Sequence, residues 1–389
     1  MNSIDDVRLA GKRVLARVDF NVPLAGGEVT DDTRIRAALP TIRTIIEAGG
    51  VAILMSHLGR PKGEDPQYSL RPVATHLEHV LGRPVTFVPA TVGVQAQEAV
   101  DAAKPGDVLL LENTRFLDGE KKNDAELARQ LGALADVYVN DAFGSAHRAH
   151  ASTEGVTHHV EVTAMGHLMR KELQYLGEAL KEPARPFVAV LGGAKVSDKI
   201  GVIQALMGKV DHLLIGGAMS YTFLKSIGHL VGTSLVENDR LGDAHDMYEA
   251  SKGRLVLPID HKVARAFDND AEQKTVTGDI PDGWMGLDIG PQSIEHYQSI
   301  LKDAKTVVWN GPMGVFEMDN FAEGTRAIAR TLAGITDQGA TTIVGGGDSV
   351  AAITQAGLDD EVSHVSTGGG AMLEFLEGQS LPGVQALDA

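Results

Sequence analysis

Short runs of apolar, β-branched residues alternate with helical patterns along the whole chain, and this alternation constrains the fold more than any other feature. Such alternation is typical of βαβ units, in which parallel strands form a sheet that helices cover. We therefore predict an α/β fold with two lobes, each a parallel sheet covered by helices in a Rossmann-like, three-layer arrangement. The predicted strands are Arg13–Val18, Val51–Met55, Val85–Val88, Val108–Leu111 and Val137–Asn140 in the first half, and Phe187–Leu191, His212–Ile215, Arg254–Pro258, Thr306–Trp309 and Thr341–Val344 in the second.

An amphipathic segment from Leu168 to Leu180 separates the two sets of strands. Met169, Leu173 and Leu176 recur at helical spacing, and Pro183 follows, so the segment predicts a helix that ends before the proline. Such a helix could belong to the core of one large domain. However, arginines and histidines precede it and glycine loops follow it, which favours an interdomain helix that joins two ligand-binding lobes.

Length and charge exclude several classes of protein. A chain of 389 residues is too long for one ordinary core, which favours two domains. A net charge of -17 argues against a nucleic-acid partner or an anionic membrane, since both need clustered positive charge. The absence of cysteine fits a reducing compartment, and neither a signal pattern nor a membrane-spanning run is present. We expect a cytoplasmic protein with no nucleic-acid or membrane partner.

Arginines follow the predicted strands of the first half. Arg60, Arg115 and Arg148 each come soon after a strand, and Arg34 opens a helical pattern. Open α/β sheets bind ligands outside the carboxyl ends of their strands, so these side chains are expected to converge. A single arginine there is usually a solvated charge, but several in an acidic protein predict a site for a small, multiply charged anion. His57, in the turn that carries Arg60, is the best histidine contact.

Glycines follow the predicted strands of the second half. Glycine lets backbone N–H groups approach a ligand closely, and the start of a helix adds a positive dipole end, so glycine loops can bind phosphate. One such loop is more often a tight turn, but four or five at successive strand ends favour a nucleotide. The loops and the polar residues beside them comprise Gly192, Gly193, Gly216, Gly217, Asn310, Pro312, Gly345, Gly346, Gly347 and Ser349.

Familiar motifs are missing from both halves. The chain has no P-loop and no Gly-x-Gly-x-x-Gly fingerprint at Gly192 or Gly345, and no serine lies in a Gly-x-Ser-x-Gly elbow. His147 and His150 lack zinc-ligand spacing with a ready third ligand, so we expect surface or hydrogen-bonded histidines there. A nucleotide held by glycine loops and lysines, opposite an arginine-rich anion site, indicates phosphoryl transfer by an unusual kinase.

Nine sequence motifs, in order and over the whole length, resemble those of the phosphoglycerate kinase family. No ligand position departs from the family pattern, and Ser349 stands where threonine is also common, which keeps the hydroxyl. The motifs are RVDFNVP (17–23), DDTRI (31–35), SHLGRP (56–61), LLENTRF (110–116), NDAFGSAHRAHAS (140–152), LGGAKVSDKI (191–200), WNGPMGVFE (309–317), GGGDS (345–349) and STGGGA (366–371).

The resemblance implies a glycolytic kinase that transfers a phosphoryl group reversibly between 1,3-bisphosphoglycerate and ADP, giving 3-phosphoglycerate and ATP. It implies a 3-phosphoglycerate-binding domain at 1–167, a hinge helix at 168–182, a nucleotide-binding domain at 183–376 and a final segment, 377–389, that returns to the first domain. We also expect a monomer. The implied substrate contacts are Asp19, Asn21, Arg34, His57, Arg60, Arg115 and Arg148.

In the second lobe the resemblance implies that Lys195 and Lys199 contact phosphates, Glu317 the ribose hydroxyls and Asp348 a Mg²⁺ ion bound with ADP or ATP. Arg34, Lys195 and Lys199 are the expected catalytic residues. The full expected nucleotide set is Gly192, Gly193, Lys195, Lys199, Gly216, Gly217, Asn310, Pro312, Glu317, Gly345, Gly346, Gly347, Asp348 and Ser349.

Two other interpretations are open to test. A nicotinamide-dependent dehydrogenase also has two α/β lobes, but the missing dinucleotide fingerprint argues against it. A non-enzymatic sensor would close on one anion without turnover, and a second, nucleotide-shaped lobe would then have no use. An assay with ATP and 3-phosphoglycerate discriminates among the three.

Overall fold

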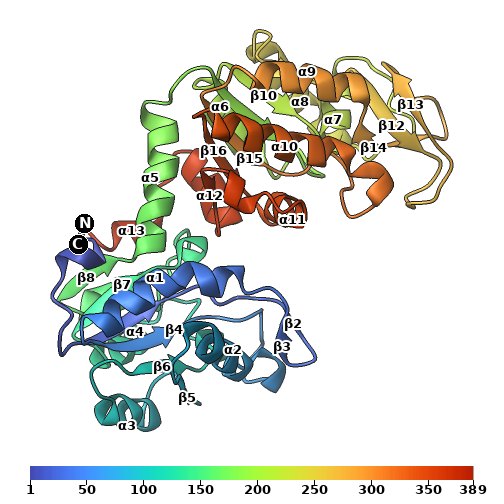
Figure 1. The fold of residues 1–389 in the computed structure, drawn as a ribbon. Coiled ribbons are helices and arrows are strands. Elements are labelled where there is room, and N and C mark those ends of the chain that lie inside the picture. Colours follow the sequence, from blue (N-terminus) through green and yellow to red (C-terminus); the bar gives the residue numbers. More distant parts are fainter. Residues whose placement is uncertain (389) are drawn as a thin grey trace. The chain divides into compact units, whose positions relative to one another are not determined.

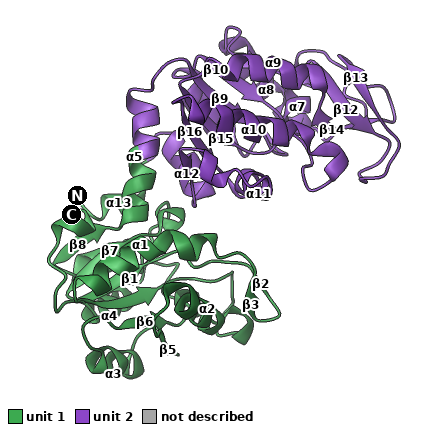
Figure 2. Cartoon of the chain, in the orientation of Figure 1, with its two compact units in different colours: residues 1–174, 380–389 green, residues 175–379 purple. Residues whose placement is uncertain are grey.

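The computed structural model describes residues 1–388, and they divide into two compact units (Figures 1 and 2). Unit 1 contains Met1–Gln174 together with the C-terminal residues from Ser380 on, and unit 2 contains Tyr175–Gln379. No helix among the described residues is long and apolar enough to cross a membrane.

Unit 1 is built on a six-stranded sheet in the order β5-β6-β4-β1-β7-β8, and every neighbouring pair is parallel. The central strands are buried on both faces, which explains their unbroken apolar runs. A small antiparallel ribbon of β2 and β3 lies outside this sheet. The strands are β1 (Arg13–Arg17), β2 (Leu24–Ala25), β3 (Glu28–Val29), β4 (Val51–Met55), β5 (Thr86–Val88), β6 (Val108–Leu111), β7 (Val137–Asn140) and β8 (Val162–Met165).

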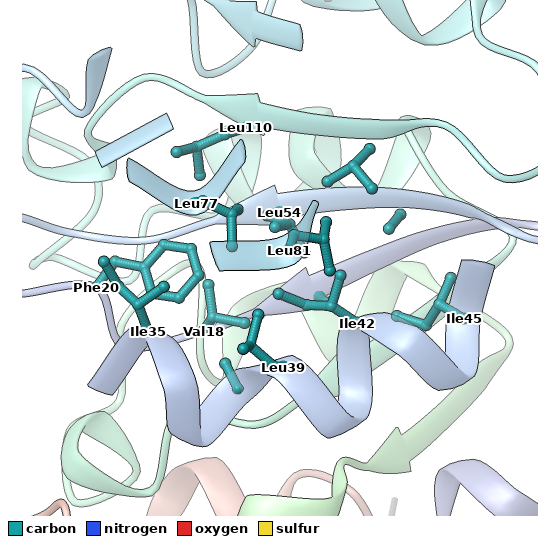
Figure 3. Packing of buried hydrophobic residues seen from close by; sticks show 14 of the residues in the cluster. Val18, Phe20, Ile35, Leu39, Ile42, Ile45, Leu54, Leu77, Leu81 and Leu110 are labelled. Atoms are coloured by element: carbon teal, nitrogen blue, oxygen red, sulfur yellow. The ribbon is translucent and has the colours of Figure 1, made fainter. Parts of the chain in front are cut away.

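Helices cover both faces of this sheet. On one face, Ile35, Leu39 and Ile42 of α1 pack with Leu77 of α2 against strand residues such as Leu54 (Figure 3). Full burial of one such side chain stabilises the fold by about 1.5–3 kcal/mol. A second buried cluster fills the other face. The helices are α1 (Thr33–Glu47), α2 (Arg71–Leu81), α3 (Val94–Ala102) and α4 (Ala125–Ala133), with short 3-10 turns η1 (Ile4–Asp6), η2 (Pro66–Tyr68), η3 (Thr114–Phe116), η4 (Phe143–Ser145) and η5 (Gly155–His159).

Helix α5 (His167–Lys181) begins in unit 1 and ends in unit 2, close to the predicted bounds. Its first turn is capped by a buried carboxylate, since Met169 N donates to Asp141 Oδ1 at 3.1 Å. The short helix α13 (Pro382–Gln385) is part of unit 1. Asn140 Nδ2, at the end of β7, donates to the carbonyl oxygen of Gly383 at 2.9 Å.

Unit 2 has a second six-stranded parallel sheet, in the order β11-β10-β9-β15-β16-β17. Trp309 is fully buried in its core, beside Val190 and Val344 of the neighbouring strands. The strands are β9 (Phe187–Leu191), β10 (His212–Ile215), β11 (Leu255–Val256), β15 (Thr306–Asn310), β16 (Thr341–Gly345) and β17 (His364–Val365). The helices are α6 (Ile200–Met207), α7 (Met219–Ser226), α8 (Leu241–Ala250), α9 (Pro291–Leu301), α10 (Glu323–Asp337), α11 (Gly347–Gln355) and α12 (Gly369–Leu376), with η6 (Asn238–Arg240), η7 (Asp319–Phe321) and η8 (Asp359–Glu361).

The expectation of only one sheet in each half was incomplete. Unit 2 also contains an antiparallel sheet, β13-β12-β14, made of β12 (Asp260–Ala264), β13 (Gln273–Thr277) and β14 (Met285–Ile289). Its edge strand β13 is polar and largely exposed, so it lacks the apolar run from which strands were predicted. Antiparallel strands need only one apolar face, which leaves a weaker signal. The short edge strands β8 and β17 were missed as well.

Candidate functional site

A compact polar group surrounds Arg34 at the carboxyl end of the unit 1 sheet. Arg34 lies in the first turn of α1, and its Nη1 donates to Asp19 Oδ1 at 3.3 Å and to the carbonyl oxygen of Asn21 at 3.0 Å. The side-chain oxygen of Asn21 accepts a hydrogen bond from Gly59 N at 2.8 Å. Since Asp19 follows β1 and Gly59 follows β4, these bonds connect two neighbouring strand ends with the start of a helix.

His57 is a buried, neutral hydrogen-bond donor. Its Nδ1 lies 3.0 Å from Arg17 Nη2, and a guanidinium can only donate, so Nδ1 accepts and the ring proton is on Nε2. Burial, and then the charges of Arg17 and Arg115, hold the pKa of His57 well below its usual value. The imidazole is therefore uncharged at neutral pH, and Nε2–H is the donor that it can offer to a ligand.

Arg115 and Arg148 complete a cluster of positive charge. Arg115 is buried and donates from Nη1 to the carbonyl oxygen of Gly59 at 2.6 Å. Burial, and then the charge of Arg148, lower the pKa of Arg115 to about 10. Its Nε is buried without a hydrogen-bond partner among the described residues. The exposed Arg60 adjoins Gly59. A guanidinium whose pKa is lowered by burial and by a neighbouring arginine is ready to bind an anion.

In unit 1, Arg17 is a residue that sequence reasoning missed. It is only 1% exposed, and its Nε donates to Ser152 Oγ at 2.9 Å. Ser152 Oγ in turn donates to the buried carboxylate of Glu120 at 2.5 Å. This chain of bonds fixes the guanidinium against His57. A charged residue in the apolar strand β1 was the available signal, because arginine is almost never fully buried unless it is paired.

His147 and His150 belong to the same cluster. Arg148 Nε donates to His147 Nε2 at 3.0 Å, so this histidine is hydrogen-bonded, as expected. Burial, and then the charge of Arg115, lower the pKa of His150 to about 4. Burial, and then the charge of Arg148, lower the pKa of His147 as well, so both rings are neutral at pH 7 and add polar groups, not charge, to the arginine cluster.

In unit 2 the ends of three neighbouring strands meet through their backbones. A Cβ atom built on Gly192, after β9, would lie 2.0 Å from the carbonyl oxygen of Pro312, after β15. Gly217, after β10, has φ +67°, and a Cβ there would lie 2.4 Å from the carbonyl oxygen of Gly193. Only glycine fits both positions, so these loops expose backbone at the sheet edge.

A cavity of about 710 Å³ opens beside these loops. Five of the predicted nucleotide residues line it, which are Gly193, Gly217, Pro312, Glu317 and Asp348. The remaining lining was not predicted: part of it lies in or beside the glycine motifs, and the rest comes from α7, from β14 and from loops that have no glycine motif. It consists of Ala194, Ala218, Tyr221, Thr233, Leu235, Phe267, Met285, Gly286, Leu287, Gly314, Val315 and Met318.

Lys199 and Asn310 form a buried polar pair near the cavity. Lys199 Nζ donates to the backbone and side-chain oxygens of Asn310. Burial lowers the pKa of Lys199 to about 8, against the opposing charges of Asp198 and Asp348. Asn310 Nδ2 is buried without a hydrogen-bond partner among the described residues, and it lies 3.0 Å from a Cβ atom built on Gly346. Lys195, by contrast, is exposed.

The start of α11 faces this pair. Gly345 ends β16, Gly346 has φ +92°, and α11 begins at Gly347, so backbone N–H groups open the helix as in a phosphate site. Ser349 Oγ accepts a hydrogen bond from Gly311 N at 2.6 Å, which ties α11 to the loop after β15. A Cβ atom built on Gly216 would lie 2.4 Å from the side-chain sulfur of Met313, so this glycine packs against a side chain, whereas Gly192 packs against backbone.

Asp348 is the carboxylate that a cation would meet here. It is exposed and lines the cavity, and no cluster of three or more metal-ligating side chains occurs among the described residues. A single carboxylate is too little for a dedicated metal site. It does fit Mg²⁺, which is usually bound by one or two carboxylates together with phosphate oxygens and water.

Comparison with known proteins gave consistent matches. The family model for phosphoglycerate kinase matches residues 4–379. A phosphoglycerate kinase of Salinibacter ruber is 58% identical over 391 residues, which covers 99% of this chain and 98% of the relative. One of Levilactobacillus brevis is 55% identical over 395 residues, with the same coverage. The solved structure of phosphoglycerate kinase from Coxiella burnetii matches with a TM-score of 0.88 and 41% identity, over 99% of this chain and 98% of that one.

Proposed function

This chain belongs to the phosphoglycerate kinase family of glycolytic kinases, and from that premise we propose that it transfers a phosphoryl group reversibly between 1,3-bisphosphoglycerate and ADP. One observation carries the proposal. Unit 1 has a cluster of arginines whose positive charges outweigh the charges of the nearby carboxylates, and unit 2 has a glycine-lined cavity of nucleotide size. A phosphoryl transfer between two anions needs both.

In unit 1 the arginine cluster binds 3-phosphoglycerate or 1,3-bisphosphoglycerate. Arg115 and Arg148 neutralise phosphate and carboxylate, and His57 donates from Nε2. The partly satisfied guanidinium of Arg115 supports this role, because its buried Nε gains a partner when an anion arrives. The contacts in this proposal are Asp19, Asn21, Arg34, His57, Arg60, Arg115 and Arg148.

In unit 2 the cavity binds ADP or ATP. Its apolar walls suit a base, Glu317 suits the ribose hydroxyls, and the start of α11 suits the phosphates. Lys199 and Asn310 supply a charge and a donor beside that helix start. Asp348 would hold Mg²⁺, which supplies charge neutralisation between the phosphates when it is bound. The domain at 1–167 is thus the phosphoglycerate domain, and that at 183–376 the nucleotide domain.

No side chain acts as a general base in this proposal. The acceptor in the ATP-consuming direction is a carboxylate, which is already ionised at neutral pH. Catalysis is then positioning together with neutralisation of the transferring group, an in-line transfer in which Arg34, Lys195 and Lys199 contact its oxygens. Water must be kept away, because it would hydrolyse an acyl phosphate.

The two ligands meet when the units close about the 168–182 hinge. Each ligand alone satisfies one unit, so only both together favour the closed state. Each chain carries one complete set of residues, and it acts as a monomer. Small-angle scattering of apo, singly liganded and ternary samples measures closure, and a radius of gyration that does not fall most in the ternary sample contradicts it.

The enzymatic test is ATP formation from 1,3-bisphosphoglycerate and ADP, with and without Mg²⁺. We expect turnover that depends on the metal. Correctly folded protein that forms no ATP at neutral pH would contradict the proposed reaction.

A further inference from the structure

The cavity of unit 2 contains one buried polar group that the proposed function does not use. Tyr221, in α7, is 3% exposed and lines the cavity together with apolar side chains such as Leu235, Phe267 and Met318. These apolar side chains can therefore pack against the flat ring of a ligand but can form few hydrogen bonds with it. The exposed Thr233 reaches solvent, so its hydroxyl can be hydrated.

The hydroxyl of Tyr221 lacks a hydrogen-bond partner among the described residues, unlike those of the two tyrosines that are fully buried. Tyr138 donates to the carbonyl oxygen of Ser152 at 2.9 Å, and Tyr297 donates to that of Ile215 at 2.6 Å. The Tyr221 oxygen is not one of the fully buried polar atoms without a partner, so it opens onto the cavity that the residue lines. The unused donor in the cavity wall therefore points to a bound group.

The position of this hydroxyl is fixed by its surroundings. A Cβ atom built on Gly286 would lie 2.1 Å from Tyr221 Oη, so the oxygen lies directly against the backbone of β14. Gly286 N is already bonded to Ser234 Oγ at 2.9 Å. On its other side the tyrosine ring meets the edge of His261, with ring centres 5.5 Å apart. Burial raises the pKa of Tyr221, so the phenol stays protonated and can donate.

We propose that the hydroxyl of Tyr221 donates a hydrogen bond to a ring nitrogen of the nucleobase and so determines which bases the cavity accepts. This inference rests on the proposed nucleotide site and adds a specificity residue to it. A purine ring nitrogen carries a lone pair that apolar walls cannot satisfy. The Tyr221 hydroxyl has no acceptor within the protein and opens onto the cavity, so it is available to donate to that nitrogen.

Tyr221→Phe removes the oxygen alone. We expect ADP affinity, measured by calorimetry on the full chain, to fall about threefold to tenfold, the range for one neutral hydrogen bond. Affinity for tripolyphosphate, which has no base, stays unchanged. The melting temperature also stays close to that of the parent, because the lost hydroxyl had no protein partner.

Analogues then identify the acceptor. The 1-deaza, 3-deaza and 7-deaza forms of ADP each lack one ring nitrogen. We expect one of them to bind the parent about as weakly as ADP binds Tyr221→Phe, and to lose nothing more in the variant. Tyr297→Phe is the matched control, since it removes a buried hydroxyl from the same unit and does not line the cavity; its preference among the analogues follows the parent.

These experiments distinguish a failure of the Tyr221 assignment from a failure of the proposed nucleotide site. The assignment to the base is overturned if Tyr221→Phe lowers the affinity for all three analogues equally. It is also overturned if the effect of the variant disappears with a 2′-deoxy or 3′-deoxy ribose instead. Either result leaves the nucleotide site intact. No change in ADP affinity also overturns it. A parent protein that binds no ADP overturns the nucleotide site, and this inference with it.

Discussion

In unit 1 the proposed binding groups are charged side chains held by other side chains, whereas in unit 2 the loops themselves form the surface of the proposed site and their backbones touch. Arg17 needs Ser152 and Glu120 behind it, but Gly192 and Gly217 need only the absence of a Cβ atom. The first construction suits a small anion with a fixed pattern of charge. The second leaves room for a large, mostly neutral ligand that is recognised by shape.

The comparison predicts the largest effect for Arg34→Ala. If Arg34 contacts the transferring group and the other arginines hold the substrate, turnover should fall about 10³-fold or more, the scale of a lost arginine finger. Steady-state kinetics measures this. Arg36→Ala is the matched control, because Arg36 lies on the same helix, is exposed and pairs with Asp32 just before the helix. A raised Michaelis constant with normal turnover would instead make Arg34 a binding residue.

Gly192→Ala tests the backbone construction of unit 2. The new methyl group would overlap the carbonyl oxygen of Pro312, so the loops after β9 and β15 must separate. We expect nucleotide affinity to fall about tenfold or more, since backbone strain costs about 1–3 kcal/mol. Gly208→Ala, at the end of α6 with open space around it, is the control and should bind as the parent does. Comparable losses in both variants would show a general loss of stability.

The pKa of Lys199, about 8, predicts a pH effect confined to unit 2. Below pH 8 the ammonium is charged; above it the charge is lost, so affinity for ADP should fall by up to about tenfold per pH unit. Phosphoglycerate binding should not follow this curve. In the free protein the sign for stability is opposite, because between pH 8 and the unfolded value the unfolded chain binds more protons, and stability rises with pH. Lys199→Arg should flatten the affinity curve, and an unflattened curve would assign it to another group.

His57 gives the smallest effect. A neutral donor predicts that His57→Ala raises the Michaelis constant for 3-phosphoglycerate about threefold to tenfold, while His57→Gln, which keeps an N–H donor, recovers most of the loss. Since the pKa of His57 lies well below its usual value, the parent should show no change in substrate affinity between pH 6 and 8 from this residue. A midpoint near 6.5 that disappears in His57→Gln would mean a charged imidazole.

The sequence predicted the regular parts of this fold well, for a physical reason. Central strands such as β4 and β6 are buried on both faces, so they must be apolar throughout, and such runs are easy to read. Strand β13 is half solvated, and β8 and β17 are short edges, so their sequences carry little of this signal.

The residues of the candidate site were harder to predict from the sequence for a different reason. Motifs indicate residues that are expected to approach a ligand by charge or by lack of a side chain, such as Arg34 and Gly217. They do not identify residues that depend on distant contacts. Arg17 is defined by Ser152, which lies 135 positions away, and Tyr221 of helix α7 by Gly286 of strand β14. Three-dimensional proximity of this kind has no local pattern in the chain.

The bond from Asn140 to Gly383 has a consequence for synthesis. Unit 2 is one continuous stretch, so a ribosome can release it whole. Unit 1 is not, because its strand β7 receives a partner from the last ten residues of the chain. Unit 1 is therefore synthesised before unit 2 but can complete its fold only after unit 2 has been synthesised. The amino group of Met1 also pairs with Asp388 at 2.7 Å, a second contact of unit 1 that depends on the 380–388 segment.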